Sequence, residues 1–166
     1  GVPYARAVAR GRPYVGARGA WRCGVDATWS SLNTWAGALY YAAHRLTGNQ
    51  PDFAKTVGRG SVWLTRGVVP KYATTIGPVK AGSSDRVDRH EEIHVFQARL
   101  FGPLYLPSVA LNYVVATVLP YWLLFRGRSR RPITGVASYF EDGVYPNVWN
   151  ELWAYRATAR KRAPGP

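Results

Sequence analysis

Four kinds of residue are scarce in this chain, and each scarcity narrows what the protein can be. Cys23 is the one cysteine among 166 residues, so the chain cannot form an internal disulfide framework. Methionine is absent, and we expect a processed product or an excised domain of a longer protein. Nine acidic residues stand against 22 basic ones, and there are three histidines. Any place where acids and histidines gather is therefore informative.

The composition predicts one folded domain. A chain of 166 residues can bury a substantial core. Its 47% hydrophobic and 14% aromatic content rules out a wholly disordered protein. No secretory signal is visible, although a trimmed chain would have lost one. A single cysteine does not identify the compartment, so a cytoplasmic, an exported and a membrane-associated protein all stay open.

The pattern His-Glu-x-x-His occurs at residues 90–94. Four residues advance a helix by slightly more than one turn, so His90 and His94 share a face. Two imidazoles placed in this way can bind one Zn²⁺, and Glu91 can take a proton from a metal-bound water. The alternative is an amphipathic helix that turns these polar residues toward water.

The flanks of the motif predict a helix over residues 86–101. Residues 83–85 are of N-cap types, and Asp88 follows in a capping-box arrangement. Gly-Pro at 102–103 is a strong stop. Ile93, Phe96 and Leu100 have the spacing of a buried stripe. The residues on one flank of this stripe are His90, His94 and Gln97.

A catalytic zinc needs a third ligand from the protein and an open position for water. Glu141 and Asp142 lie in an Asp-Gly run that is typical of a turn. Glu151 lies in a run with a helix-start signature, for which Asn147 is the expected cap. Because a helix orients a ligand rigidly, Glu151 is the candidate, and a solvated carboxylate near the helix dipole is the alternative. For His44 we expect a packed or surface histidine.

These residues carry a resemblance. The runs HEEIHVFQARLFGPLYLP at 90–107 and ELWAY at 151–155 resemble small bacterial HExxH zinc metallopeptidase-like proteins of the gluzincin type, a group of zincins. The resemblance implies one catalytic Zn²⁺ with His90, His94 and Glu151 as ligands and Glu91 as general base. It also implies a peptide or protein substrate. The chain is shorter than well-studied gluzincins, and no downstream His or Tyr matches their oxyanion-stabilising residue.

Several further residues are candidates for supporting roles. Asp85, Asp88 and Gln97 can orient an imidazole by hydrogen bonding, although the two aspartates can equally cap the helix. Tyr155 is expected to help seat the helix that carries Glu151.

Residues 60–66 and 72–80 have the composition of strands. Pro78 would confine the second strand to an edge or to its own end. The resemblance suggests that the edge 73–80, which includes Thr75 and Ile76, holds an extended peptide by backbone pairing. A hairpin that only covers the core is the alternative. The predicted fold class is α+β: a minimal zincin-like domain in which the HExxH helix packs on further helices with a small β-hairpin or sheet.

Two other helical regions are expected. Residues 31–46 read as a helix whose buried face contains Leu32, Trp35, Leu39 and Ala42 or Ala43. Residues 104–125 contain no charge, but two prolines interrupt them. A buried core helix, a membrane-associated surface and a true membrane span are the three interpretations of this run.

The net charge of +13 comes mainly from arginine clusters near residues 6–22, 126–131 and 156–162. Such clusters can bind an acidic protein, an anionic membrane surface or nucleic acid, although solvated termini would show them too. No recognisable nucleic-acid module accompanies them. We expect residues 1–24 to form a basic, flexible or partner-bound arm, 25–162 the zincin-like domain and 163–166 a tail.

The sequence therefore favours a zinc-dependent hydrolase, a metallopeptidase that cleaves peptide bonds with a metal-activated water. Two other classes stay open. One is a delivered effector or toxin domain with the same chemistry. The other is a non-catalytic basic module that binds nucleic acid or an anionic membrane surface and in which the histidines are structural.

Overall fold

The fold is α+β, with one small sheet among helices. The computed structural model describes residues 2–68, 72–82, 84, 87–128 and 132–159. The chain divides into two units, Gly1–Tyr105 and Leu106–Pro166, and each has its own hydrophobic cluster.

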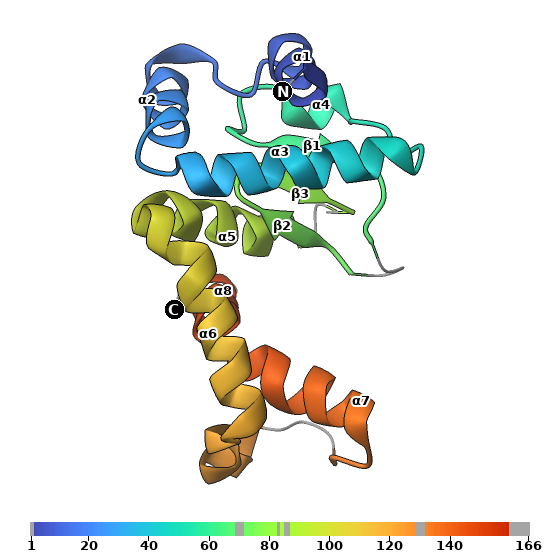
Figure 1. The fold of residues 1–166 in the computed structure, drawn as a ribbon, viewed down its shortest axis with the longest axis vertical. Coiled ribbons are helices and arrows are strands. Elements are labelled where there is room, and N and C mark those ends of the chain that lie inside the picture. The colour runs from blue at the N-terminus through green and yellow to red at the C-terminus, as the bar shows by residue number, and fades with distance from the viewer. Residues whose placement is uncertain (1, 69–71, 83, 85–86, 129–131, 160–166) are drawn as a thin grey trace, which may run out of the picture. The chain divides into compact units, whose positions relative to one another are not determined.

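The helices of the first unit surround the sheet. They are α1 (Val2–Gly11), α2 (Gly16–Ala27), α3 (Ser31–Leu46), α4 (Phe53–Thr56) and α5 (Asp88–Phe101), followed by the short 3-10 helix η1 (Gly102–Leu104). Figure 1 shows α3 crossing the sheet, with α1 and α4 beside strand β1 and α5 beside strand β2. The predicted helix over residues 31–46 has these bounds in the structure.

The sheet has three short strands in the order β1-β3-β2. They are β1 (Val62–Leu64), β2 (Thr74–Ile76) and β3 (Val79–Ala81). β1 pairs with β3 in parallel, and β2 pairs with β3 antiparallel as a hairpin. The one strand expected over residues 72–80 is thus two strands joined at Gly77-Pro78. Gly77 has φ of 53°, and a Cβ there would lie 2.1 Å from the carbonyl oxygen of Asn33, so the turn requires glycine.

The N-terminal residues belong to this core, and the expectation of a flexible or partner-bound arm over residues 1–24 is not met where the structure describes them. Ala7 in α1 is 2% exposed and clusters with Tyr41 and with residues of β1 and β3. Tyr4 and Val8 pack against the same cluster. One face of α1 is apolar, and this face covers the core while Arg6 stays exposed.

The orientation of α3 is the reverse of the prediction. Leu32, Trp35 and Leu39, expected in the core, are exposed. The buried residues of this helix are Asn33, Gly37, Tyr41 and His44. The physical reason is close approach: a Cβ on Gly37 would lie 2.7 Å from the carbonyl oxygen of Ile76, so only a small residue fits between α3 and β2. His44 is a packed histidine, and Asn49 Nδ2 lies 2.8 Å from its Nδ1.

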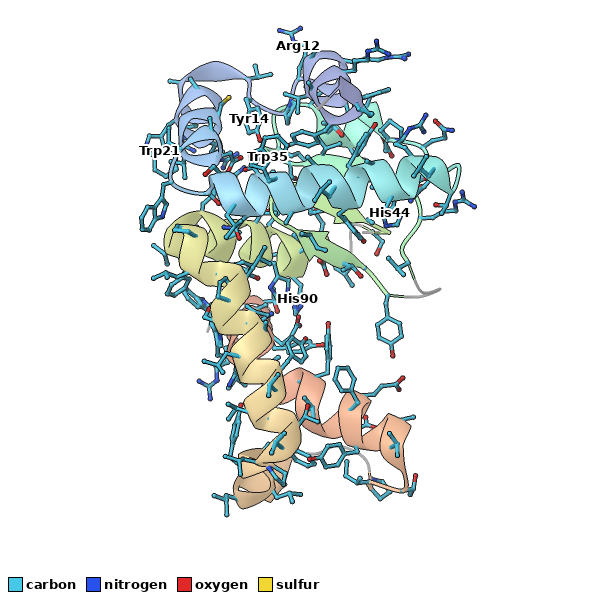
Figure 2. All side chains as sticks on the ribbon, viewed as in Figure 1. Arg12, Tyr14, Trp21, Trp35, His44 and His90 are labelled. Atoms are coloured by element: carbon cyan, nitrogen blue, oxygen red, sulfur yellow. The ribbon has the colours of Figure 1, made fainter. Side chains whose placement is uncertain are left out.

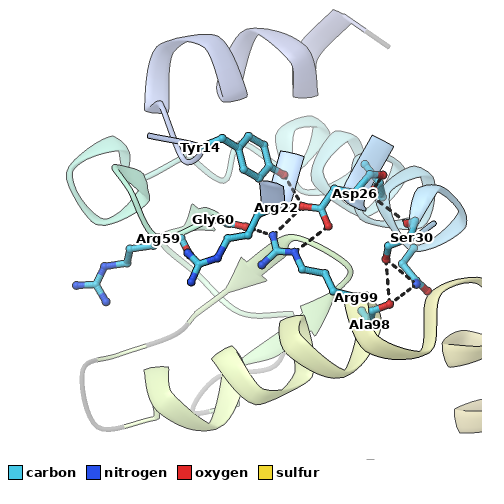
Figure 3. A network of polar contacts seen from close by, with 10 residues as sticks. Tyr14, Arg22, Asp26, Ser30, Arg59, Gly60, Ala98 and Arg99 are labelled. Carbon is cyan, nitrogen blue, oxygen red and sulfur yellow. Dashed lines mark hydrogen bonds and ion pairs between the residues drawn. The ribbon is translucent and has the colours of Figure 1, made fainter. Parts of the chain in front are cut away.

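A buried ion pair joins α2 to α5 (Figure 3). Arg99 donates from Nε and Nη2 to the two carboxylate oxygens of Asp26, at 2.8 and 2.7 Å. Tyr14 donates its hydroxyl to the same carboxylate at 2.8 Å, and Arg99 also donates to the carbonyl of Gly60. Both oxygens of the Asp26 carboxylate accept hydrogen bonds from Arg99, which offsets the cost of burying the two charges.

The second unit contains α6 (Tyr105–Val118, whose first residue belongs to the first unit) and a series of shorter helices. They are η2 (Tyr121–Arg128), α7 (Val136–Ser138), the π-helix η3 (Tyr139–Val144), η4 (Tyr145–Asn147) and α8 (Trp149–Ala159). Trp122 packs with Ala116 and Val144 and donates its indole N–H to the Ala116 carbonyl. The turn expected at 141–143 is wrong, because these residues are helical and Gly143 lies against the Trp122 ring.

The uncharged run 104–125 is not a buried core helix. Ala116 is fully buried, but Leu111, Val114, Val118 and Leu119 are exposed. Within the described residues, one helical run, Asp88–Val118, is long and apolar enough to cross a membrane by length and composition alone. Such a single run is weak evidence for a span.

Candidate metal centre

Helix α5 buries its polar face. Its buried residues are Asp88, Glu91, His94, Val95, Gln97 and Ala98. Phe96 and Leu100, predicted to lie in the core, are about half exposed at 51% and 49%. The helix ends at Phe101 as predicted, because Gly102 has φ of 54° and the Trp29 indole leaves no room for a Cβ there. Glu91 and His94 of the motif are therefore held inside the protein, while His90 is half-buried.

The two histidines of the motif lie against each other. His90 Nε2 and His94 Nε2 are 3.1 Å apart, and the two rings meet edge to face with centroids 4.8 Å apart. Two nitrogen ligands of a tetrahedral zinc, each about 2.05 Å from the ion, are separated by roughly 3.3 Å. The spacing of the pair therefore suits two ligands of one ion, as the helical register implied. His90 is labelled in Figure 2.

Gln97 orients the second imidazole. Its Oε1 lies 3.0 Å from His94 Nδ1, and the Tyr105 hydroxyl lies 3.4 Å from the same oxygen. An amide oxygen only accepts hydrogen bonds, so this contact places a proton on Nδ1 and leaves the lone pair of Nε2 for a metal. Gln97 is fully buried, which holds this geometry in place.

The carboxylate of Glu91 is held by the edge strand. Glu91 is 5% exposed, and the Thr75 hydroxyl on β2 donates to its Oε2 at 2.5 Å. This contact fixes the carboxylate of the residue that directly follows His90 on the helix. Ile76 lies on the same strand, and its backbone faces α3 at Gly37. Thr75, expected to contact a substrate, contacts the expected base.

Asp88 neither caps the helix nor orients an imidazole. It accepts a hydrogen bond from Lys80 Nζ on β3 and another from Arg59 Nη1, both at 2.6 Å. Val87 takes the N-cap position without a side-chain cap, and Asp85 lies outside the described residues. Lys80 is completely buried and stands 4.3 Å from the Trp63 ring centroid. Asp88 thus anchors the first turn of α5 to the sheet.

Lys80 was not singled out from the sequence. Burial lowers its pKa below the ordinary value of 10.5, while the hydrogen bond and the charge of Asp88 act in the opposite direction. The signal for it was a lysine inside an otherwise apolar strand in a chain with few acids. Such a lysine needs a buried carboxylate as its partner.

Glu151 lies in the first turn of α8 in the second unit. It is 5% exposed, and the side-chain amide of Asn150 lies 3.5 Å from its Oε1. The helix is not capped by Asn147, because the backbone N–H of Trp149 donates to Asn112 Oδ1 on α6 at 2.8 Å. Asn147 instead donates to the carbonyl of Gly143. Tyr155, one turn further along α8, is 45% exposed.

Comparison of the chain with protein-family models, with curated proteins and with solved structures finds no match. The functional argument therefore depends on the residues and their geometry.

Proposed function

We propose that the protein is a zinc-dependent hydrolase, a metallopeptidase that cleaves peptide bonds. His90, His94 and Glu151 would hold one Zn²⁺, and Glu91 would act as the general base. The observation that carries this proposal is the histidine pair on α5, whose Nε2 atoms are 3.1 Å apart, together with the buried Glu91 on the same helix. This is the arrangement that the His-Glu-x-x-His pattern needs for metal-assisted hydrolysis.

The chemistry of the donor set supports the metal. His90 and His94 offer two imidazoles on α5, and Glu151 offers a buried carboxylate on α8. Two imidazoles and one carboxylate are the ligands of many catalytic zinc sites, and they leave a fourth position open. Gln97, through Nδ1 of His94, fixes the tautomer that a metal requires.

A Zn²⁺ held by His90, His94 and Glu151 would supply Lewis-acid chemistry, which would polarise the scissile carbonyl and lower the pKa of the attacking water. The Glu91 carboxylate takes one proton from this water as its oxygen forms a bond to the carbonyl carbon. Glu91 then gives the proton to the amide nitrogen as the carbon–nitrogen bond breaks. Thr75 keeps the carboxylate in position through both transfers.

The strand β2 offers a place for the peptide. It is an outer strand of the sheet, its three residues are half-buried, and Thr75 contacts Glu91. An extended peptide that adds to this edge would run past the base with its backbone fixed by hydrogen bonds. Side-chain selectivity would then come from the residues that flank β2.

Metal analysis of the purified protein tests the site. We expect one equivalent of zinc, which the His94→Ala and Glu151→Ala variants lose. The matched controls are His44→Ala and Glu141→Ala, which change the same residue types elsewhere and should keep the zinc. A peptide library should be cleaved by the zinc-loaded protein and not after chelation. A protein that binds no zinc and is unchanged by these substitutions would instead support a non-catalytic basic module.

A further inference from the structure

The outer face of α3 presents a row of large apolar side chains. Leu32, Trp35, Leu39 and Leu46 are 48%, 65%, 69% and 89% exposed. Their spacing along the helix, i, i+3, i+7 and i+14, places them on one side. We name these four residues the α3 stripe. A contiguous row of this kind is unusual on a surface that faces only water.

The four residues of the stripe cannot be buried by a rotation of α3. The opposite face of α3 packs on the sheet through Gly37 and on α5 through Asn33, whose side-chain amide donates to the carbonyls of Ala98 and Gly102 at 3.0 and 2.7 Å. Rotating the helix to bury the stripe would break these bonds and drive large side chains against β2. The packing of α3 therefore keeps the stripe on the protein surface.

Two further tryptophans of the first unit are exposed. Trp21 on α2 is 68% exposed, and Trp29, just before α3, is 52% exposed. The indole N–H of Trp29 donates to the carbonyl of Leu100 at 3.3 Å, so its ring is held in place. Trp21 and Trp35 are labelled in Figure 2. Tryptophan is the residue most typical of the boundary between lipid and water.

Arg18 on α2 is exposed and precedes the exposed Trp21 by one helical turn. Arg22 and Arg45 are half-buried and donate to the carbonyls of Arg59 and Asn49. Asp26 is the one acidic residue between positions 16 and 50, and it is buried and paired with Arg99. The exposed surface of α2 and α3 is thus apolar and cationic without an exposed acid.

We propose that the α3 stripe, with Trp21 and Trp29, docks this protein on a lipid bilayer that contains anionic headgroups. The leucines and indoles enter the boundary between headgroups and acyl chains, and Arg18 binds the headgroup phosphates and carboxylates. The proposal is independent of the metal site.

Flotation with large vesicles tests the proposal. We expect the wild-type chain to float with vesicles of phosphatidylcholine and phosphatidylserine, more weakly with phosphatidylcholine alone, and less as salt rises. The Trp35→Gln/Leu39→Gln double variant should bind the mixed vesicles about tenfold more weakly or worse, because it removes two apolar anchors. Arg18→Gln should reduce the preference for phosphatidylserine.

Matched measurements separate the outcomes. Val57→Gln changes an apolar residue of similar exposure outside the stripe and should bind like the wild type. Equal urea midpoints would show that each variant is folded, and His94→Ala should still bind vesicles whatever its zinc content. A wild type that does not float, or a double variant that floats equally well, overturns the proposal. A third outcome also overturns it: the wild type sediments as a dimer and does not bind vesicles, and Leu39→Gln dissociates the dimer. The stripe would then bind a second copy of the chain.

Discussion

The inner face of α5 and the outer face of α3 reverse the pattern of an ordinary water-soluble helix. The inner face of α5 buries Asp88, Glu91, His94 and Gln97. The outer face of α3 exposes leucine and tryptophan at matching helical intervals. The two helices belong to the same unit, so the reversal is a property of this fold and not of one irregular segment.

The inner face of α5 and the outer face of α3 differ in the groups that their side chains contact. The buried polar groups of α5 contact Thr75, Lys80 or one another, and each contact offsets part of the cost of removing a polar group from water. The α3 stripe is left on the outside. The comparison teaches that burial in this unit follows the available partners of a side chain and not its polarity alone.

The largest effect should come from the inner face. Glu91→Gln keeps the shape of the side chain and its contact with Thr75 but removes the base. We expect kcat for a cleaved peptide to fall by roughly 10²–10⁴-fold, with the zinc content unchanged. Glu92→Gln, its exposed neighbour on the same helix, is the control and should keep full activity. Undiminished turnover in Glu91→Gln would remove this residue from the mechanism.

The next effect concerns the anchor of α5. Lys80→Met leaves the carboxylate of Asp88 paired only with Arg59, whose side chain is 40% exposed. We expect the free energy of unfolding to fall by about 3 kcal/mol, because one partner of a buried pair is gone. Arg59→Met should cost at most about 1 kcal/mol, since that pair is partly solvated. Equal urea midpoints for both variants would contradict this ranking.

A smaller loss should follow from the contact between α3 and α5. Asn33→Ala removes the donor to two buried carbonyls, those of Ala98 and Gly102. We expect a loss of roughly 1–3 kcal/mol in the free energy of unfolding, measured in urea. Gln50→Ala, at an exposed amide, serves as the control and should be nearly neutral. An unchanged midpoint for Asn33→Ala would mean that the polar inner face of α3 is not stabilising.

The buried histidine of α3 should make stability depend on pH. Burial, and then the charge of Arg66, lower the pKa of His44 below its ordinary value of 6.5. Between the lowered value and 6.5, the unfolded chain binds a proton that the folded chain does not, so stability falls as pH drops through 6.5. Urea unfolding at about pH 7.5 and 5.5 should show this loss. His44→Gln should reduce it, and an identical pH dependence in that variant would refute the assignment.

The smallest effect on stability should come from the outer face. Leu39→Gln should change the free energy of unfolding by no more than about 0.5 kcal/mol, because the side chain is 69% exposed. Leu64→Ala, in the core of β1 and 1% exposed, should cost roughly 2–5 kcal/mol. Similar losses in both leucine variants would show that the stripe is covered by the protein itself.

Local features of the fold could be predicted well. The helix over residues 31–46 and the end of α5 at Phe101 follow from neighbouring residues, since caps, stops and periodicity act within one or two turns. The break at Gly77-Pro78 was available from the same kind of signal. The orientation of α3 and the burial of Phe96 and Leu100 on α5 were predicted wrongly, because a period of 3.6 residues shows that a helix has two faces and not which of them is buried.

The long-range contacts could not be predicted. Thr75 meets Glu91, and Lys80 meets Asp88, because strands β2 and β3 pair in one register beside α5. A shift of that register by one residue would turn each of these side chains to the other side of the sheet. The asparagine that caps α8, Asn112, comes from another helix, so no local cap signature could reveal it.

The amino-acid sequence by itself determined the spacing of His90 and His94, because helical geometry places positions i and i+4 on one face wherever the helix lies. It also determined a strongly basic surface, since the 22 basic residues outnumber the nine acidic ones. Only the tertiary structure decided that the polar side of α5 is buried and the apolar side of α3 exposed. Burial depends on packing contacts between residues that lie far apart in the chain.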